Sequence, residues 1–371
     1  MNVLFLTTHL NTGGITSYLL TLTRGMRRQG MGVYIGSSGG NMENEFRAAG
    51  ATIIPLDIRT KSELDIRIYA CLPRLKRLVS DHEIDIIHAH TRITQVMGTW
   101  LSRLTEVPYV STCHGFFKPR LFRRLFPCWG KAVIAISGPV RDHLRMDFRM
   151  PQDKVVLIPS GVDVDLYSSK PDVQTKKRIK WRNEYNLGEG PVLGMIARFS
   201  DVKGQDIAVE AMRIIVLKIP KAKLLLAGEG KMEQKLREMV KSFQLESRVI
   251  FCPVVNQTAG LLSALDIFLV PSRQEGLGIS IMEAQAAGLP VVASRVGGIP
   301  DLIEHDRTGI LVEPEDPAAL AEAVIALCRD EHRRVELGQA AKEFIRENYS
   351  ADAMVAATLG FYKSVISGKG Q

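Results

Sequence analysis

Short apolar runs alternate with longer amphipathic stretches along the whole chain. Residues 3–7 are apolar and β-branched, residues 16–29 carry apolar side chains at helical spacing, and residues 33–37 are apolar again. Because strands that alternate with helices form parallel βαβ units, the pattern predicts parallel sheets. Further strands are expected at residues 52–56, 84–88, 109–112, 132–136, 155–159, 192–197, 223–227, 249–251, 267–270, 291–294 and 309–312.

The alternation is interrupted once, after residues 160–163, by a polar and strongly charged stretch that contains Pro171 and Lys176. We place a domain linker there, which predicts two doubly wound α/β domains, residues 1–165 and 166–351, followed by a helical segment at 352–371. Ligands of such sheets bind beyond the carboxyl ends of the strands. Two such domains that face each other would form an active site in the cleft between them.

The charge of the chain is concentrated in its first half. Of 48 Lys and Arg and 40 Asp and Glu, residues 1–165 hold 21 and 14, a net +7, whereas residues 166–371 hold 27 and 26, a net +1. We therefore expect an anionic partner to meet the first domain. No apolar run approaches the ~20 residues of a membrane span, residues 1–6 do not resemble a signal peptide, and the odd set of five cysteines indicates reduced thiols. These features predict a cytoplasmic protein.

Two cations follow the first strand of the second domain. Arg198 and Lys203 lie five residues apart, where a strand ends and a helix begins. A guanidinium fork and an ammonium group beside free helix amides are suited to a diphosphate. A solvated charged loop is the alternative.

A glycine-rich turn follows the strand at 267–270. Gly276 and Gly278 allow backbone amides to approach a phosphate, because glycine has no Cβ. If both were helical, Glu275 and Glu283 would lie about 80° apart and project to one side. Carboxylates near a phosphate are best explained as acceptors for sugar or ribose hydroxyls. The alternatives are a surface carboxylate for Glu275 and a salt-bridge partner for Glu283.

Together with Gly228-Glu229-Gly230 and Gly13-Gly14, each after a strand, these elements resemble the retaining GT-B glycosyltransferases, specifically glycosyltransferase family 4, the glycosyl transferases group 1. The resemblance covers essentially the whole chain. It implies two Rossmann-like domains across a cleft, a nucleotide-sugar donor (a UDP-sugar is expected) held by the second domain, an acceptor held by the first, and no metal or other cofactor. It also implies that the helix in 352–371 crosses back to the first domain.

The resemblance assigns roles to particular residues. Arg198 and Lys203 would neutralise the diphosphate, while Glu283 would bind the ribose and Glu275 the transferred sugar. His114, just after a strand, would lie near the reacting carbon; a buried, satisfied histidine is the alternative. Pro253 replaces a frequent glycine in the loop that reads the base, which leaves the base open. The remaining donor contacts would come from Gly13, Gly14, Gly228, Val254, Gly276, Leu277, Gly278 and Ile279.

Basic and aromatic residues are interleaved in residues 116–131. This segment contains Lys118, Arg123 and Trp129 and no acidic residue. It is typical of contact with an anionic membrane surface, which would place the protein on the inner face of the cytoplasmic membrane. The alternative is that the aromatic rings are core and the cations are solvated. A lipid-linked glycan, as in lipopolysaccharide or other cell-envelope synthesis, is then the expected acceptor, and a soluble sugar phosphate is the alternative.

Other functions are less well supported by the sequence. No strand is followed by a complete G-x-G-x-x-G, which disfavours a nicotinamide-dependent oxidoreductase, and no nucleic-acid motif is present. A non-catalytic nucleotide-sugar-binding module stays open. His88 and His90 have no third ligand at metal spacing and are best explained as strand-end residues near the cleft. His9 is expected to line the cleft, and a catalytic base is the alternative. Asp163-x-Asp165 is expected in the linker rather than on a metal. Ser137 reads as a helix N-cap.

Overall fold

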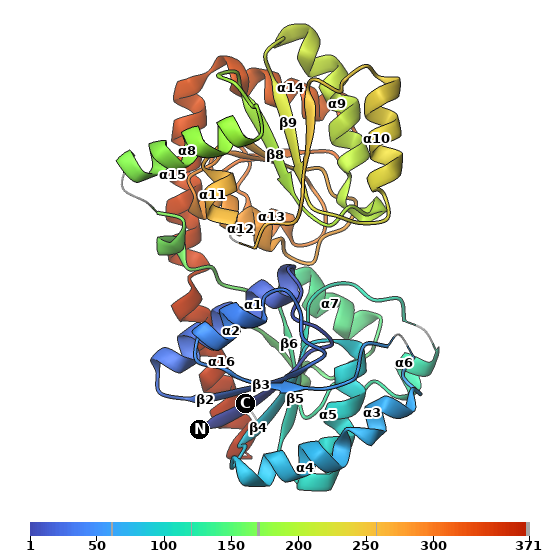
Figure 1. Ribbon diagram of the computed structural model, residues 1–371. Coiled ribbons are helices and arrows are strands. Elements are labelled where there is room, and N and C mark those ends of the chain that lie inside the picture. Colours follow the sequence, from blue (N-terminus) through green and yellow to red (C-terminus); the bar gives the residue numbers. More distant parts are fainter. Residues whose placement is uncertain (61, 120, 169–170, 257, 369–371) are drawn as a thin grey trace. The chain divides into compact units, whose positions relative to one another are not determined.

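The chain folds into two compact units. The computed structural model describes residues 1–60, 62–119, 121–168, 171–256 and 258–368, and the backbone alone of residues 121, 122 and 171. One unit comprises residues 1–161 and 351–371, and the other comprises residues 162–350. The boundary thus lies shortly before the predicted one. Each unit is a parallel sheet covered by helices (Figure 1).

The first unit is built on a seven-stranded parallel sheet with the strand order β3-β2-β1-β4-β5-β6-β7. Its strands begin and end close to the apolar runs of the sequence, which a sheet buried on both faces requires. Its elements are β1 (Asn2–Leu6), α1 (Gly14–Arg28), β2 (Gly32–Ser37), α2 (Glu43–Ala48), β3 (Thr52–Pro55), α3 (Ile66–Ala70), α4 (Leu72–Asp81), β4 (Ile86–Ala89), α5 (Arg92–Thr105), β5 (Tyr109–Cys113), α6 (Leu121–Leu125), β6 (Val133–Ala135), α7 (Gly138–Met146), η1 (Gln152–Lys154), β7 (Val155–Leu157) and α16 (Ala351–Ile366).

Helix α16 returns from the end of the chain to pack on α1. A Cβ built on Gly25 of α1 would lie 2.4 Å from the Cγ2 of Val355, so the two helices are in close contact. Arg28 pairs with Asp352 at 2.9 Å, and the Tyr362 hydroxyl hydrogen-bonds Nδ1 of the buried His88. The first unit is therefore completed by the C-terminal segment, of which residues 369–371 lie outside the described residues.

The second unit is built on a six-stranded parallel sheet with the order β10-β9-β8-β11-β12-β13. Its elements are η2 (Val164–Leu166), α8 (Pro171–Glu184), β8 (Val192–Ile196), η3 (Asp201–Lys203), α9 (Gln205–Lys218), β9 (Lys223–Ala227), α10 (Glu233–Ser242), β10 (Val249–Cys252), α11 (Thr258–Leu262), β11 (Ile267–Val270), α12 (Ile279–Ala286), β12 (Val291–Ser294), α13 (Ile299–Leu302), β13 (Ile310–Val312), α14 (Pro317–Arg329) and α15 (Glu331–Asn348).

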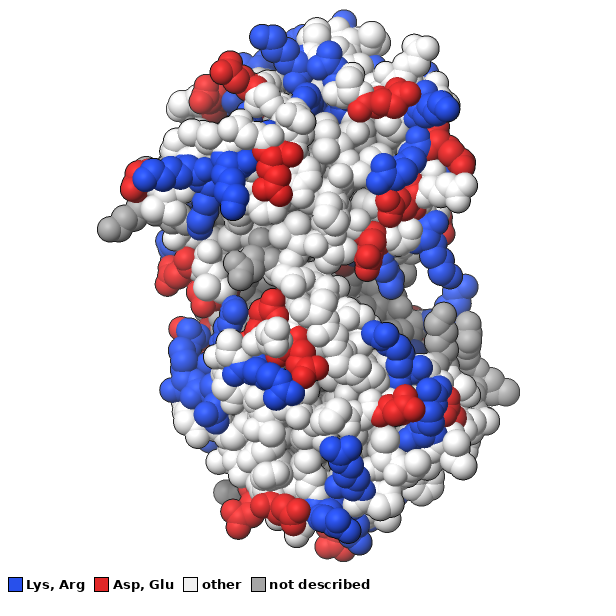
Figure 2. Space-filling view, viewed as in Figure 1, with Lys and Arg blue, Asp and Glu red and all other residues white. Residues whose placement is uncertain are grey.

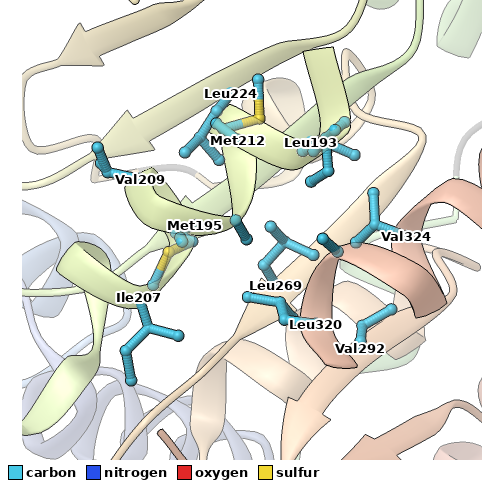
Figure 3. Close-up of a cluster of buried hydrophobic side chains, with 14 of the residues drawn as sticks. Leu193, Met195, Ile207, Val209, Met212, Leu224, Leu269, Val292, Leu320 and Val324 are labelled. Atoms are coloured by element: carbon cyan, nitrogen blue, oxygen red, sulfur yellow. The ribbon is translucent and has the colours of Figure 1, made fainter. Parts of the chain in front are cut away.

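The core of the second unit lies between its sheet and the helices α9, α10 and α14. Leu193 and Met195 of β8 and Leu269 of β11 meet Met212 of α9 and Leu320 of α14, all of them buried (Figure 3). Burying each such side chain contributes about 1.5 to 3 kcal/mol. The strand ends are thus fixed by a packed core, and so are the loops that follow them.

The predicted linker is wrong for residues 171–184, because this charged stretch is the helix α8 of the second unit. Two of its arginines, Arg178 and Arg182, donate to the two carboxylate oxygens of Asp266, each at 2.7 Å. Trp181 of α8 packs against Gly260, since a Cβ built on this glycine would lie 2.5 Å from Nε1 of the Trp181 ring. Ion pairs and one ring, rather than an apolar stripe, hold this helix, so its sequence carries no amphipathic signal.

Both sheets reverse their strand order beside their first strand. In the first unit β1 lies between β2 and β4, and in the second unit β8 lies between β9 and β11. Open α/β sheets bind ligands outside the carboxyl ends of the strands at such a reversal. The predicted doubly wound α/β class is confirmed, and the loops after β1, β4, β8 and β11 are where a site is expected.

Candidate active site

The loops that follow β8, β11 and β12 lie in direct backbone contact. A Cβ on Gly204, after β8, would lie 1.8 Å from the carbonyl oxygen of Pro271, after β11. A Cβ on Gly298, after β12, would lie 2.3 Å from the carbonyl oxygen of Gly276, and the Gly298 amide donates to the Glu275 carbonyl at 3.1 Å. Only glycine allows backbones to approach this closely. The cation-bearing β8 loop and the glycine-rich β11 loop, which the sequence predicts as separate elements, therefore pack directly against each other.

Arg273 fastens the β11 loop to the start of α9. It donates to both carboxylate oxygens of Asp206, at 3.0 and 2.9 Å, and to the Asp201 carbonyl at 2.7 Å. Its Nε also donates to Glu315 at 2.9 Å. The carboxylates of Asp206 and Glu315 raise the pKa of the Arg273 guanidinium above its usual value. Sequence reasoning missed this residue, because its partners lie far away along the chain.

Lys203 and Glu275 are bound to each other. The Lys203 ammonium, at the end of η3, donates to Oε2 of Glu275 in the β11 loop. Arg198 is exposed, and its guanidinium has no hydrogen-bond or ion-pair partner within the ranges that the structure describes. The structure thus brings Lys203 to the β11 loop and leaves Arg198 at the surface of the β8 loop.

Helix α12 begins without a side-chain cap. Its N-cap residue is Gly278 with φ 108°, a left-handed conformation that favours glycine, and among the described residues no side chain hydrogen-bonds its first amides. An uncapped helix start favours an anion through its N–H groups and its dipole. Leu277 is buried beneath this turn, and Ile279 is the first helical residue. This geometry is suited to a phosphate.

Glu283 is a buried carboxyl group inside α12. It is 8% exposed and accepts a hydrogen bond from the Thr258 hydroxyl at 3.1 Å, and burial raises its pKa to about 7. Glu275 lies before the helix, so the prediction that the two carboxyls share a helix face is wrong: they have different partners, Lys203 and Thr258. Thr258 was missed, since a threonine carries no distinctive signal in the sequence.

The raised pKa predicts pH-dependent donor binding if Glu283 accepts hydrogen bonds from hydroxyls. The ionised carboxylate is the better acceptor, so affinity is lost as the pH falls through about 7. With about a tenth of the group ionised at pH 6, we expect the donor KM to be about tenfold higher than at pH 8. Initial rates over this range measure it. A Glu283→Gln enzyme should bind weakly at both pH values; an unchanged pH dependence in that variant would rule out Glu283 as the titrating group.

The loop after β9 borders the β8 loop. A Cβ on Gly228 would lie 2.1 Å from the Ala197 carbonyl oxygen, and a Cβ on Gly230 would lie 2.2 Å from that of Phe199. Pro253 is exposed after β10, and Val254 is half-buried beside it. The predicted base-reading loop thus follows β10, the strand next to β9 in the sheet.

In the first unit, the β1 loop leads into an uncapped helix. Gly13 and Gly14 are exposed at the start of α1, where no side chain of the described part of the chain hydrogen-bonds the first amides. His9 is exposed earlier in the same loop, and its Nδ1 accepts from the Asn11 amide at 3.3 Å. The 15-residue helix therefore presents its positive end at the carboxyl edge of the sheet.

His114 lies directly after β5 and is half-buried. Its Nε2 lies 3.1 Å from Nδ1 of His90, and the Tyr18 ring stands edge-on at 4.8 Å between centroids. Burial lowers the pKa of His114 to about 3, so its imidazole is neutral at physiological pH. His90 was predicted only as a strand-end residue, and its contact with His114 was not foreseen.

Ser137 was predicted as a helix cap, and Asp163 and Asp165 were predicted as linker residues. Ser137 is the N-cap of α7, as predicted, and its hydroxyl accepts from the Val140 amide at 3.3 Å. The Asp163 carboxylate caps η2 by accepting from the Asp165 amide at 3.2 Å. Over the described ranges, no three His, Cys, Asp or Glu side chains come together as metal ligands do.

The basic and aromatic segment 116–131 is divided between core and surface. Trp129 is 3% exposed and Arg123 is 9% exposed, with its guanidinium 4.0 Å from the centroid of the Phe117 ring. Leu125 and Phe126, by contrast, are 64% and 57% exposed. The prediction of membrane contact is therefore wrong for Trp129 and Arg123. It stays a prediction for the exposed Leu125 and Phe126 at the end of α6. Arg120 and the side chains of Leu121 and Phe122 lie outside the described residues.

Comparison with known proteins identifies the class to which this fold and this site belong. Residues 177–344 match the family model described as glycosyl transferases group 1, and residues 12–166 match the one described as glycosyltransferase family 4. The chain belongs to this family of GT-B glycosyltransferases, as the sequence motifs indicated.

Individual relatives support the assignment. The D-inositol 3-phosphate glycosyltransferase of Pseudarthrobacter chlorophenolicus is 30% identical over 319 residues, which are 80% of this chain and 74% of that protein. The GDP-mannose-dependent alpha-(1-6)-phosphatidylinositol monomannoside mannosyltransferase of Mycobacterium tuberculosis is 28% identical over 375 residues, 95% of this chain and 94% of that one. The crystal structure of Anabaena HepE in complex with UDP and glucose superposes with a TM-score of 0.85 at 21% identity, over 98% of this chain and all of that one. The protein is thus a glycosyltransferase with the GT-B fold.

Proposed function

We propose that this glycosyltransferase moves a hexose from a nucleotide sugar to a hydroxyl group of an anionic glycan or lipid-linked acceptor, with retention of configuration and without a metal. The observation that carries the proposal is the contact of Lys203 with Glu275, held by Arg273 beside the uncapped start of α12. A cation and free helix amides are suited to a diphosphate, and a carboxylate is suited to the hydroxyls of a sugar.

The charges required by the departing group are supplied by side chains. As the bond from the sugar C1 to the phosphate oxygen breaks, negative charge grows on the diphosphate. Lys203, Arg198 and the amides at the start of α12 stabilise this charge more in the transition state than before it. The side chains of Lys203 and Arg198 would supply the positive charge that a divalent ion otherwise brings to a diphosphate. Full activity in the presence of excess EDTA is the expected result.

Retention follows from attack on the face that the diphosphate leaves. The acceptor oxygen forms its bond to C1 while the departing phosphate oxygen takes the hydroxyl proton, so atoms and charge balance without a protein base. His114 fits this scheme as a neutral hydrogen-bond donor, because its pKa of about 3 makes it a poor base. The anomeric configuration of the product, compared with that of the donor by NMR, tests retention directly.

The names of two relatives favour a phosphorylated acceptor. One is named for D-inositol 3-phosphate and the other for phosphatidylinositol monomannoside. The net +7 of residues 1–165 agrees with an anionic acceptor at the first unit. We include lipid-linked cell-envelope glycans, lipopolysaccharide precursors among them, and sugar phosphates as the soluble alternative.

A donor panel decides the function. The purified protein is assayed by thermal shift and by transfer with UDP-glucose, UDP-N-acetylglucosamine and GDP-mannose, and we expect a UDP-sugar to stabilise it most. Stabilisation by RT ln(1 + [L]/Kd) ranks these donors by affinity, and the two UDP-sugars differ only in the sugar. Stabilisation with neither hydrolysis nor transfer would indicate a binding module, and no response to any nucleotide sugar would overturn the proposal.

We further propose that the end of α6 contacts an anionic membrane on the cytoplasmic side. The exposed Leu125 and Phe126 are flanked by the exposed Arg124. Arg92 joins them to a second exposed apolar site, since it donates to the Phe126 carbonyl at 2.7 Å and to the Glu63 carboxylate next to Leu64, which is 72% exposed. Elsewhere, basic and acidic side chains are interspersed on the face that Figure 2 shows. Within the described part of the chain, no helix is long and apolar enough to cross a bilayer.

The membrane contact predicts salt-sensitive binding to vesicles. A Leu125→Ser, Phe126→Ser double variant is expected to lose at least about tenfold in affinity for anionic vesicles at low salt, because each buried apolar side chain contributes above 1 kcal/mol. Cosedimentation with anionic and with zwitterionic vesicles measures it. Leu217→Ser, at a site on α9 that is 78% exposed, is the matched control. Equal binding by wild type and double variant would contradict the contact.

A further inference from the structure

Imidazole rings are linked to one another at the carboxyl ends of β4 and β5. His88 lies in β4, His90 directly follows that strand, and His114 directly follows β5. The His90 and His88 rings are in tilted contact with their centroids 4.1 Å apart, and Nε2 of His88 lies 2.7 Å from the Thr112 hydroxyl. The buried sheet thus fixes the rings of His88 and His90. His90 in turn orients His114, because Nδ1 of His90 lies 3.1 Å from Nε2 of His114.

The two imidazoles that share this hydrogen bond are both neutral. Burial lowers the pKa of His90 well below its usual value, and that of His114 to about 3. A hydrogen bond between two neutral imidazoles needs one N–H and one free lone pair. The tautomer of His90 therefore determines the tautomer of His114.

The surroundings of His90 favour one of the two arrangements. Its Nε2 is buried and has no hydrogen-bond partner in the part of the chain that the structure describes, and the Phe5 and Tyr18 rings pack beside it at 5.5 and 5.8 Å. A buried N–H without an acceptor is rarer in proteins than a buried lone pair without a donor. The proton of His90 therefore belongs on Nδ1, from which it is donated to Nε2 of His114.

We propose that His90 is a positioning residue that holds His114 as its Nδ1–H tautomer, so that His114 offers a hydrogen-bond donor to the substrate. The Nδ1 of His114 has no hydrogen-bond partner within the described residues, and the side chain is half-buried, which leaves this nitrogen for a ligand oxygen. The inference rests on the proposed function, in which that oxygen belongs to a substrate of the transferase. In this proposal His90 orients the imidazole of His114, and His114 contacts the substrate.

Nitrogen NMR of the free protein tests the tautomer without any assay of activity. With ¹⁵N-labelled histidine, His114 is expected to show a protonated Nδ1 and an unprotonated Nε2 at neutral pH. His90→Leu removes the shared proton, and His114 should then populate both tautomers. A wild-type His114 with its proton on Nε2 would overturn the proposal.

Kinetics test the consequence for catalysis. We expect His90→Leu to lower kcat about 10- to 100-fold, on the scale of removing an orienting partner, while the donor KM changes less than about threefold. His90→Asn carries an amide N–H near the position of Nδ1 and should recover most of this loss. His332→Leu, the same substitution at an exposed histidine of α15, is the matched control.

The outcomes separate the two proposals. If His90→Leu does not fold, the wild-type tautomer and the His90→Asn rates still decide the question. Absence of transfer from every nucleotide sugar, together with the expected tautomer, would overturn the proposed function and leave the positioning intact. Normal transfer by a folded His90→Leu enzyme would overturn the positioning role.

Discussion

Replacing Lys203 with alanine is expected to lower kcat/KM for sugar transfer about 30- to 1000-fold, that is by about 2 to 4 kcal/mol. The ammonium group lies in the β8 loop at the reversal of strand order, where the proposed function places the leaving diphosphate. Because that charge grows as the bond to the sugar breaks, most of the loss should appear in kcat.

The loss should be specific to this cation. Lys218 is an exposed lysine at the opposite end of α9, and Lys218→Ala should leave the rates within about twofold, as expected for a surface substitution. Thermal unfolding of both variants checks that the fold is kept. A folded Lys203→Ala enzyme with normal turnover would show that the diphosphate binds elsewhere.

Replacing Glu275 with glutamine is expected to have opposite effects on two quantities. In the free protein this carboxylate forms an ion pair with Lys203, in which the Lys203 side chain is 26% exposed and that of Glu275 is 14% exposed. Glutamine removes the competing negative charge, so a nucleoside diphosphate should bind about three- to tenfold more tightly, in line with about 1 kcal/mol for a partly exposed ion pair. Sugar transfer should fall about 100-fold, because hydrogen bonds from sugar hydroxyls to a charged acceptor are worth about 1.5 to 3 kcal/mol each.

Calorimetry with UDP and initial rates with the nucleotide sugar measure these two effects separately. Glu210→Gln, at an exposed position of α9, is the matched control, since it removes the same charge away from the loops. Weaker binding of the diphosphate by Glu275→Gln would mean that Glu275 does not compete with it. An unchanged transfer rate would remove Glu275 from the sugar site.

The strands could be predicted from the sequence because burial on both faces leaves a local record. The runs at 223–227, 267–270 and 291–294 are found as β9, β11 and β12 with the predicted ends, whereas β4 begins at Ile86 rather than at residue 84. Helix α8 was missed for the opposite reason. It is held by Arg178 and Arg182 on Asp266, more than 80 residues further along the chain, and such a pairing leaves no periodicity.

The sequence by itself determined the alternation of strands and helices, the glycines at the ends of strands and the kinds of charged groups that follow them, since hydrophobic period and turn chemistry are local properties. The tertiary structure alone decided which of these groups meet. Lys203 is bound to Glu275 rather than free, Glu283 is separated from Glu275 by its burial in α12, and His114 is held by His90. The contacts of Lys203 with Glu275 and of His90 with His114 join loops that only the parallel sheets bring together, because the strands of each sheet end at one edge.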